Sequence, residues 1–148
     1  TRSLVQQQAN YIREHSRDRY IAVTELCGTA TVNWGMKQWA ATGQVLVGTA
    51  EIFRVALVDH GYICATDFSL AIFDECHHAG GKNPYVGVLK ALQNTRVAMP
   101  TPHILGLTAL FANGCLTGLL TKRKQLERCL QATIHSPDME GYEKVQNF

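Results

Sequence analysis

The 148-residue chain lacks several features that would assign it to a class of protein at once. No apolar run approaches the roughly 20 residues that a membrane-spanning helix needs, so we expect no membrane partner. The sequence has no secretory signal, no Asn-x-Ser/Thr acceptor and no Cys-x-x-Cys pair. Its five cysteines are odd in number and scattered, which argues against a disulfide framework and a zinc site. We therefore expect reduced thiols in a cytoplasmic protein.

Charge and chain start set two further expectations. The formal net charge is +2, so the overall charge does not by itself require a nucleic-acid partner. There is no initiator Met, and Thr1 runs directly into a helical pattern. We expect an excerpt from a longer chain, with residues 1–135 in one domain and residues 136–148 in a linker to a downstream region.

Strand and helix patterns alternate along the sequence. Short continuous apolar runs are typical of strands in a parallel sheet, and segments with helical periodicity separate them. We expect strands at residues 20–26, 44–48, 70–73 and 103–107, and helices at residues 4–15, 34–41, 50–60, 119–134 and from residue 84 onward. This order predicts a three-layer α/β fold with a mainly parallel sheet.

The stretch of residues 68–78 organises the rest of the chain. Residues 70–73 are apolar without alternation, which predicts a strand covered on both faces of the sheet. The strand runs into two carboxylates and two imidazoles: Asp74, Glu75, His77 and His78. Acids beside so apolar a run must find a strong partner, and open α/β sheets bind ligands outside the carboxyl ends of their strands. A ligand-binding crevice is favoured here over an ordinary polar loop.

Two motifs carry a resemblance to a known family. The DECH sequence at residues 74–77 resembles the second motif of superfamily 2 DExH-box helicases, in the form found in Dicer helicase domains and RIG-I-like RNA sensors. A second apolar segment, residues 104–107, runs into Thr108 and Ala109 and resembles the family's third motif. The resemblance implies the first RecA-like (P-loop NTPase-type) lobe, incomplete at its N-terminus. It is greatest to Dicers, and the microRNA-processing Dicer of insects is one candidate.

The resemblance also implies a role for each residue of these motifs. In the intact enzyme, Asp74 would hold Mg²⁺ through water, and Glu75 would orient the water that attacks the γ-phosphate of ATP. His77, with Thr108 and Ala109, would link the nucleotide site to the RNA-bound face. ATP and Mg²⁺ are therefore the implied cofactors.

RNA contacts are implied at two further places. Residues 4–8 resemble the end of motif Ia, where Gln7 and Gln8 would contact the RNA backbone, although a polar helix face is an equally good interpretation. Thr49 matches the Thr of motif Ib and precedes a helix whose free N–H groups suit a phosphate. The implied substrate is double-stranded or hairpin RNA, cut by ribonuclease III domains outside this chain in RNA interference and microRNA processing. The implied protein partner is the double-stranded-RNA-binding protein of Dicer.

Three other interpretations stay open. Glu51 and Leu110 depart from the family pattern, and the Gly-Gly-Lys of residues 80–82 is followed by Asn83 and does not meet the P-loop pattern. A degenerate lobe that binds RNA or protein without hydrolysing ATP fits these departures. A RIG-I-like sensor would share the motifs. A metal hydrolase would use the ligand types of Asp74, Glu75, His77 and His78.

Overall fold

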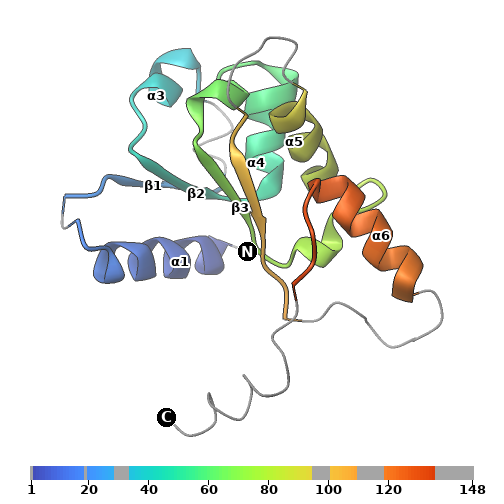
Figure 1. The fold of residues 1–148 in the computed structure, drawn as a ribbon. Coiled ribbons are helices and arrows are strands. Elements are labelled where there is room, and N and C mark those ends of the chain that lie inside the picture. The colour runs from blue at the N-terminus through green and yellow to red at the C-terminus, as the bar shows by residue number, and fades with distance from the viewer. Residues whose placement is uncertain (1, 19, 29–33, 95–100, 110–118, 136–148) are drawn as a thin grey trace, which may run out of the picture.

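The computed structural model describes residues 2–18, 20–28, 34–94, 101–109 and 119–135. Its helices and strands alternate as predicted (Figure 1): α1 (Arg2–His15), β1 (Val23–Leu26), α3 (Met36–Ala40), β2 (Val45–Gly48), α4 (Ala50–Arg54), β3 (Leu70–Phe73), α5 (Pro84–Gln93), β4 (His103–Gly106) and α6 (Leu119–Leu130). A π-helical turn, Val55–Asp59, continues α4, and 3-10 turns lie at Ala65–Asp67 and Cys76–His78. None of the described helices is long and apolar enough to cross a membrane.

The four strands form two parallel pairs. β1 pairs with β2 in the register Val23↔Val45, and β3 pairs with β4 in the register Leu70↔His103. In the described part of the chain, no strand hydrogen bonds join the two pairs. The predicted parallel pairing is therefore confirmed within each pair, but the expected single sheet is divided.

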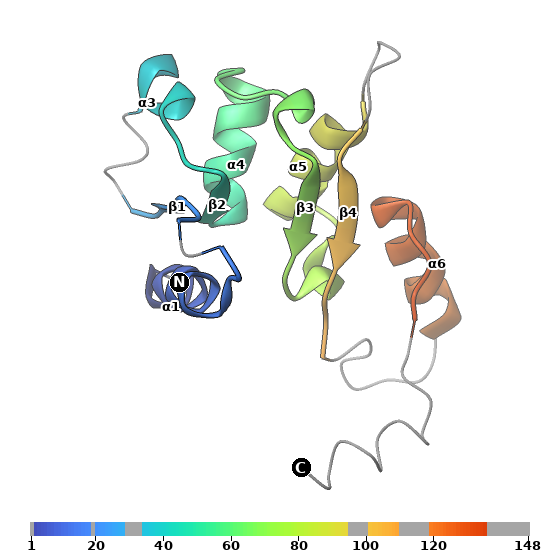
Figure 2. The same ribbon diagram turned by 60° about the vertical axis from the view of Figure 1, so that its left-hand side comes forward.

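Helices cover the β1–β2 pair on both faces. On one face, Val5 and Ala9 of α1 pack against Val47, and Figure 2 shows α1 end-on beside this pair. On the other face, Leu26 packs with Trp39 of α3 and with the helix that follows β2. Trp39 is buried, so this large aromatic side chain belongs to the core.

Among the described residues, helices cover the β3–β4 pair on one face only. There, Phe73 packs with Leu89 of α5 and Leu126 of α6. The opposite face carries four apolar side chains that are about half exposed: Leu70 (49%), Ile72 (57%), Leu105 (45%) and Leu107 (47%). The prediction that residues 70–73 are covered on both faces is therefore wrong for this chain. An apolar run does not determine which helix packs on which face, and α1 packs on the other pair.

Local signals at the helix ends have mixed outcomes. The Asn83 side chain accepts a hydrogen bond from the backbone N–H of Tyr85 (3.0 Å), with proline in the first helical position, and so caps α5. Thr49 occupies the corresponding position before α4, but its side chain makes no capping bond. α6 ends before Ile134 because Gln131 adopts a left-handed conformation with φ 51°.

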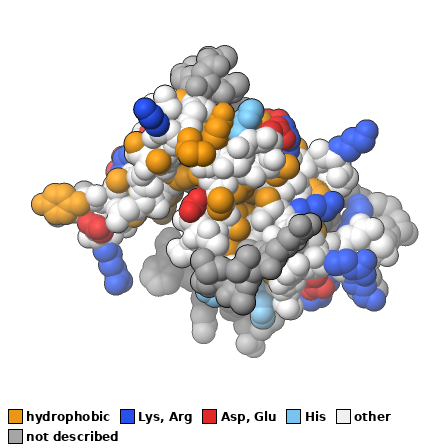
Figure 3. Space-filling model, turned by 90° about the horizontal axis from the view of Figure 1, so that it is seen from above, with side chains coloured by type: hydrophobic (Ala, Val, Ile, Leu, Met, Phe, Trp, Pro, Cys, Tyr) orange, Lys and Arg blue, Asp and Glu red, His pale blue; other side chains and the backbone are white. Residues whose placement is uncertain are grey.

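The outer side of α6 is basic. Several Lys and Arg side chains lie on the side of the molecule that carries this helix (Figure 3). Those of α6 are all exposed: Lys122, Arg123, Lys124 and Arg128. Arg123 is paired with Glu127 at 3.1 Å, so the other three supply the excess positive charge of the helix.

Candidate active site

The DECH residues form the turn that leaves the carboxyl end of β3. Asp74 follows the strand directly, and Glu75 adopts a left-handed conformation with φ 49° and ψ 44°. Few residues other than glycine occupy this region, and those that do are concentrated at functional sites. The reversal starts the 3-10 turn Cys76–His78 and leaves the Glu75 side chain 52% exposed. The turn therefore presents both carboxylates at the end of the strand.

Three hydrogen bonds fix Asp74. Its Oδ1 accepts from the backbone N–H of Glu75 at 2.9 Å, and its Oδ2 accepts from the side-chain amide of Gln8 at 2.8 Å. Its backbone carbonyl accepts from the hydroxyl of Tyr85 at 2.7 Å. A carboxylate offers about four lone-pair sites, so about two stay available to a ligand. The sequence alone does not indicate this role of Tyr85.

Backbone hydrogen bonds join this turn to the end of β4. The N–H of Leu107 donates to the carbonyl of Phe73 at 2.8 Å, and the N–H of Cys76 donates to the carbonyl of Leu107 at 2.9 Å. The second and third motifs predicted from the sequence therefore meet at one edge of the β3–β4 pair.

His77 connects the two motifs through its side chain. Its Nδ1 lies 2.8 Å from Oγ1 of Thr108 and 3.1 Å from Oε2 of Glu75. Because this nitrogen faces a carboxylate oxygen, the tautomer with a proton on Nδ1 is favoured, and that proton is donated toward Glu75 and Thr108. The structure thus brings Asp74, Glu75, His77 and Thr108 together, and the exposed Ala109 follows directly.

Two groups beneath the turn are kept protonated by burial. Burial raises the pKa of the Cys76 thiol, so this side chain is a packing residue and not a thiolate nucleophile. Burial likewise raises the pKa of Tyr85, which retains the proton that it donates to Asp74. Gly106 leaves the space that Cys76 fills, because a Cβ atom on Gly106 would lie 2.9 Å from the Cys76 sulfur.

Comparison with known proteins places the chain in a family. The family model described as "Type III restriction enzyme, res subunit" matches residues 1–113. The chain belongs to this family.

Several individual proteins are similar to the chain over most of its length. "Endoribonuclease Dicer homolog 2b" of Oryza sativa subsp. japonica is 35% identical over 149 residues, which cover 93% of the chain and 10% of the relative. "Endoribonuclease dcr-1" of Caenorhabditis elegans is 32% identical over 142 residues, covering 90% of the chain and 7% of the relative. "ATP-dependent RNA helicase DHX58" of Mus musculus is 33% identical over 121 residues, which cover 78% of the chain and 18% of the relative. The predicted resemblance to Dicers is confirmed, and the chain spans about a tenth or less of the Dicers.

A solved structure supports the fold. The crystal structure of the Pyrococcus furiosus Hef helicase domain matches 96% of this chain and 29% of its own, with a TM-score of 0.66 and 26% sequence identity. The predicted α/β RecA-like fold with an incomplete sheet is therefore confirmed.

Among the residues predicted to contact RNA, only Gln8 enters the hydrogen-bond network described above. Gln7 is exposed on α1, and Thr49 lies between β2 and α4 in the other strand pair. Gln8, in contrast, binds Asp74. The two neighbouring glutamines, for which the resemblance implied the same RNA contact, therefore have different surroundings.

The family departure at Glu51 is compensated locally. Nε and Nη2 of Arg54 donate to the two carboxylate oxygens of Glu51 at 2.9 and 2.7 Å. These bonds lower the pKa of Glu51 and offset its negative charge beside Thr49. Leu110, the other departure, lies outside the described residues.

The metal-hydrolase interpretation lacks a ligand shell. Within the described ranges, no group of three or more His, Cys, Asp or Glu side chains is placed to hold one metal ion. His78 lies against His77, with ring centroids 4.0 Å apart and planes tilted by 44°. The carboxylate oxygens of Asp74 suit Mg²⁺, which keeps most of its waters and needs one or two protein carboxylates.

Proposed function

We propose that the chain is part of the first RecA-like lobe of an ATP-dependent helicase domain in a Dicer-type endoribonuclease. Residues 1–135 would belong to the lobe, and residues 136–148 would lead to a downstream region. The observation that carries the proposal is the 2.8 Å contact between His77 and Thr108, because it joins the acid turn to the third motif. The similarity to Dicers over about nine tenths of the chain supports it.

ATP and Mg²⁺ are the cofactors we propose. Mg²⁺ would neutralise the charge that develops on the transferred phosphoryl group. Asp74 would hold the hydrated ion. The hydrogen bond from Gln8 to its carboxylate and the one from Tyr85 to its backbone carbonyl would position it for that role. Glu75 has a half-exposed carboxylate that would accept a hydrogen bond from the attacking water and orient it. His77, Thr108 and Ala109 would transmit the state of this site to the RNA-bound face.

The proposed substrate is double-stranded or hairpin RNA, processed in microRNA or small interfering RNA production. Gln7 would contact the RNA backbone from α1, and Thr49 from the start of α4. Arg54 supports the second contact because it offsets the charge of Glu51. We also propose a cytoplasmic location, from the scattered cysteines, and a double-stranded-RNA-binding protein as partner.

The substitution Glu75→Gln tests the proposal in the full-length protein. It keeps the size of the side chain and removes the charge that would hold the attacking water. We expect RNA-stimulated ATP hydrolysis to fall by about 10²–10⁴-fold while RNA binding is retained. Hydrolysis at the rate of the unsubstituted protein would contradict the assignment of Glu75 to the attacking water. If the unsubstituted protein binds RNA but hydrolyses no ATP, the non-hydrolysing scaffold is the better description.

A second candidate function is an RNA-sensing helicase of the RIG-I-like group. The similarity to the mouse ATP-dependent RNA helicase favours it. Cleavage of long double-stranded RNA by the full-length protein separates the two candidates: a Dicer yields short fragments, and a sensor leaves the RNA intact.

A further inference from the structure

Three successive glutamines on α1 have different surroundings. Gln6 and Gln7 are exposed, while Gln8 is partly buried at the border of the stripe that packs on β1–β2. From there, Nε2 of Gln8 donates to Oδ2 of Asp74 at 2.8 Å, across 66 residues of sequence. One glutamine of the run therefore reaches the acid turn of the other strand pair.

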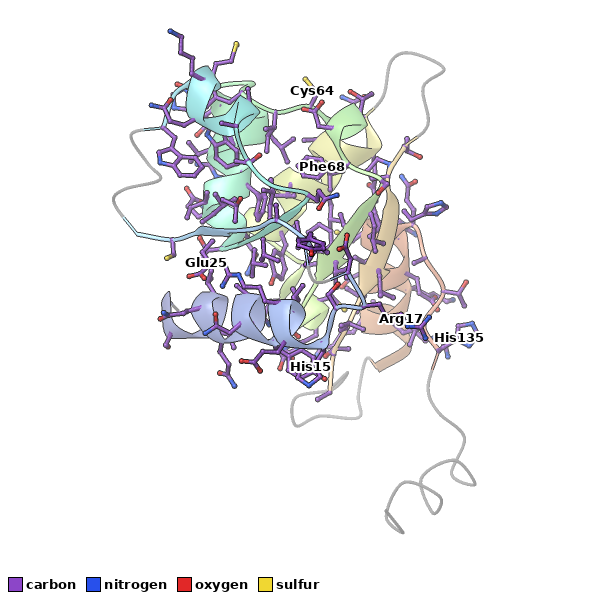
Figure 4. All side chains as sticks on the ribbon, turned by 90° about the vertical axis from the view of Figure 1, so that its left-hand side faces the viewer. His15, Arg17, Glu25, Cys64, Phe68 and His135 are labelled. Carbon is purple, nitrogen blue, oxygen red and sulfur yellow. The ribbon has the colours of Figure 1, made fainter. Side chains whose placement is uncertain are left out.

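The helix that carries Gln8 is firmly placed. Val5 and Ala9 are buried against the strands. Arg13 pairs with Glu25 at 2.7 Å and donates to the carbonyl of Val23 at 2.9 Å. Figure 4 shows Glu25 on the side of β1 that faces α1. Because these contacts hold α1 against the strands, a donor on this helix has a defined position relative to them.

The bond from Gln8 determines the orientation of the carboxylate. The other donor to the Asp74 side chain, the N–H of Glu75, belongs to the same turn and moves with it. Gln8 ties the second oxygen to a separate element, and so restrains rotation of the carboxyl group. Carboxylates that hold metal ions generally depend on such outer hydrogen bonds for their orientation.

We propose that Gln8 is a positioning residue for the Asp74 carboxylate in the nucleotide site, and not a contact to RNA. The inference rests on the proposed function, because it assumes that Asp74 serves Mg²⁺. The exposed Gln7 keeps its predicted RNA contact. α1 then carries one glutamine toward the nucleotide and its neighbour toward RNA.

The test is the Mg²⁺ dependence of RNA-stimulated ATP hydrolysis in the full-length protein. Gln8→Met keeps the length of the side chain and removes the donor, and Gln6→Met makes the same change at an exposed position of the same helix. We expect Gln8→Met to raise the Mg²⁺ concentration for half-maximal rate about 10-fold and to leave the RNA concentration for half-maximal rate unchanged. Gln6→Met should change neither.

Each other outcome overturns the inference. If Gln8→Met raises the RNA concentration for half-maximal rate and leaves the Mg²⁺ dependence unchanged, Gln8 is an RNA contact. If neither changes, the bond from Gln8 to Asp74 does not contribute to Mg²⁺ binding. Gln8→Ala, which also suits a helix, should reproduce the Mg²⁺ shift. If thermal unfolding shows that both Gln8 variants fail to fold, the contact is structural. Glu75→Gln separates the two proposals: if it abolishes hydrolysis while Gln8→Met has no effect, only the inference on Gln8 fails.

Discussion

The β1–β2 and β3–β4 pairs are built alike and are surrounded differently. Each consists of two parallel strands of four residues, and the second strand of each ends in glycine, at Gly48 and at Gly106. Helices enclose β1–β2 on both faces. β3–β4 has helices on one face and leaves Leu70 and Ile72 about half exposed on the other.

Because of this difference, the pair that buries more apolar surface is not the pair that carries the acid turn. The enclosed pair gains the full benefit of removing apolar surface from water, while the half-open pair forfeits part of it. The acid turn lies at the end of the half-open pair, and α1 reaches this turn through Gln8 while packing on the enclosed pair. The enclosed pair thus supports α1, and the half-open pair presents the acid turn at its end.

The largest expected effect contrasts the two faces of β3. Phe73→Ala removes a buried aromatic side chain, so we expect the free energy of unfolding of the 148-residue chain to fall by about 3–5 kcal/mol. Ile72→Ala, on the open face, should lower it by less than about 1 kcal/mol. Urea unfolding measures both. Equal losses would mean that the open face is covered in solution, and the contrast between the pairs would disappear.

The two strand-end glycines provide the next comparison. A Cβ on Gly106 would lie 2.9 Å from the Cys76 sulfur, and one on Gly48 would lie 2.8 Å from Cβ of Leu26. Gly106→Ala and Gly48→Ala should each lower the free energy of unfolding by about 1–3 kcal/mol through overpacking. Only Gly106→Ala displaces the acid turn, so only it should also shift the NMR signals of His77. A shift of equal size in Gly48→Ala would contradict this separation.

Helix capping gives a smaller contrast. Asn83→Ala removes the side-chain cap of α5 and should lower the free energy of unfolding by about 1 kcal/mol. Thr49→Ala changes the equivalent position before α4, where no capping bond exists, and should stay within about 0.5 kcal/mol. Thermal unfolding of both variants measures the difference. A larger loss for Thr49→Ala would show that this threonine caps its helix after all.

The smallest expected effect is on the pH dependence of stability, and it should be similar beside the two strand pairs. A hydrogen bond from the backbone N–H of Ile134 lowers the pKa of Glu127 on α6, and the Arg54 side chain lowers the pKa of Glu51 on α4. Because both pKa values are depressed on folding, each contribution to stability is complete above the ordinary value of 4.5 and is lost as the pH falls below it. Glu127→Gln and Glu51→Gln should each slightly flatten the loss of stability on acidification. A steeper loss in either variant would contradict the sign.

Features that depend on neighbouring residues could be predicted from the sequence. The cap at Asn83 and the acid turn after residues 70–73 are examples, because one strand pattern or one capping residue determines them. The meeting of residues 74–77 with Thr108 also followed, since parallel strands end at the same edge of a sheet.

Features that depend on packing between distant segments could not be predicted. The bond between Gln8 and Asp74 requires α1 to bring Gln8 within reach of the turn after β3, and no residue pattern on either segment indicates this. The same applies to the open face around Ile72 and to the hydroxyl of Tyr85. Periodicity predicts that a helix has a buried stripe, but not which strands that stripe will cover.

The most direct test of the nucleotide site is the affinity of the full-length protein for MgATP, measured by equilibrium dialysis. Asp74→Asn removes the charge at the end of the half-open pair, and Asp59→Asn removes an exposed charge that pairs with Arg54 in the turn after α4. We expect Asp74→Asn to weaken MgATP binding about 10–100-fold and Asp59→Asn to leave it unchanged. Equal affinity in both variants would contradict the assignment of Asp74 to the nucleotide site.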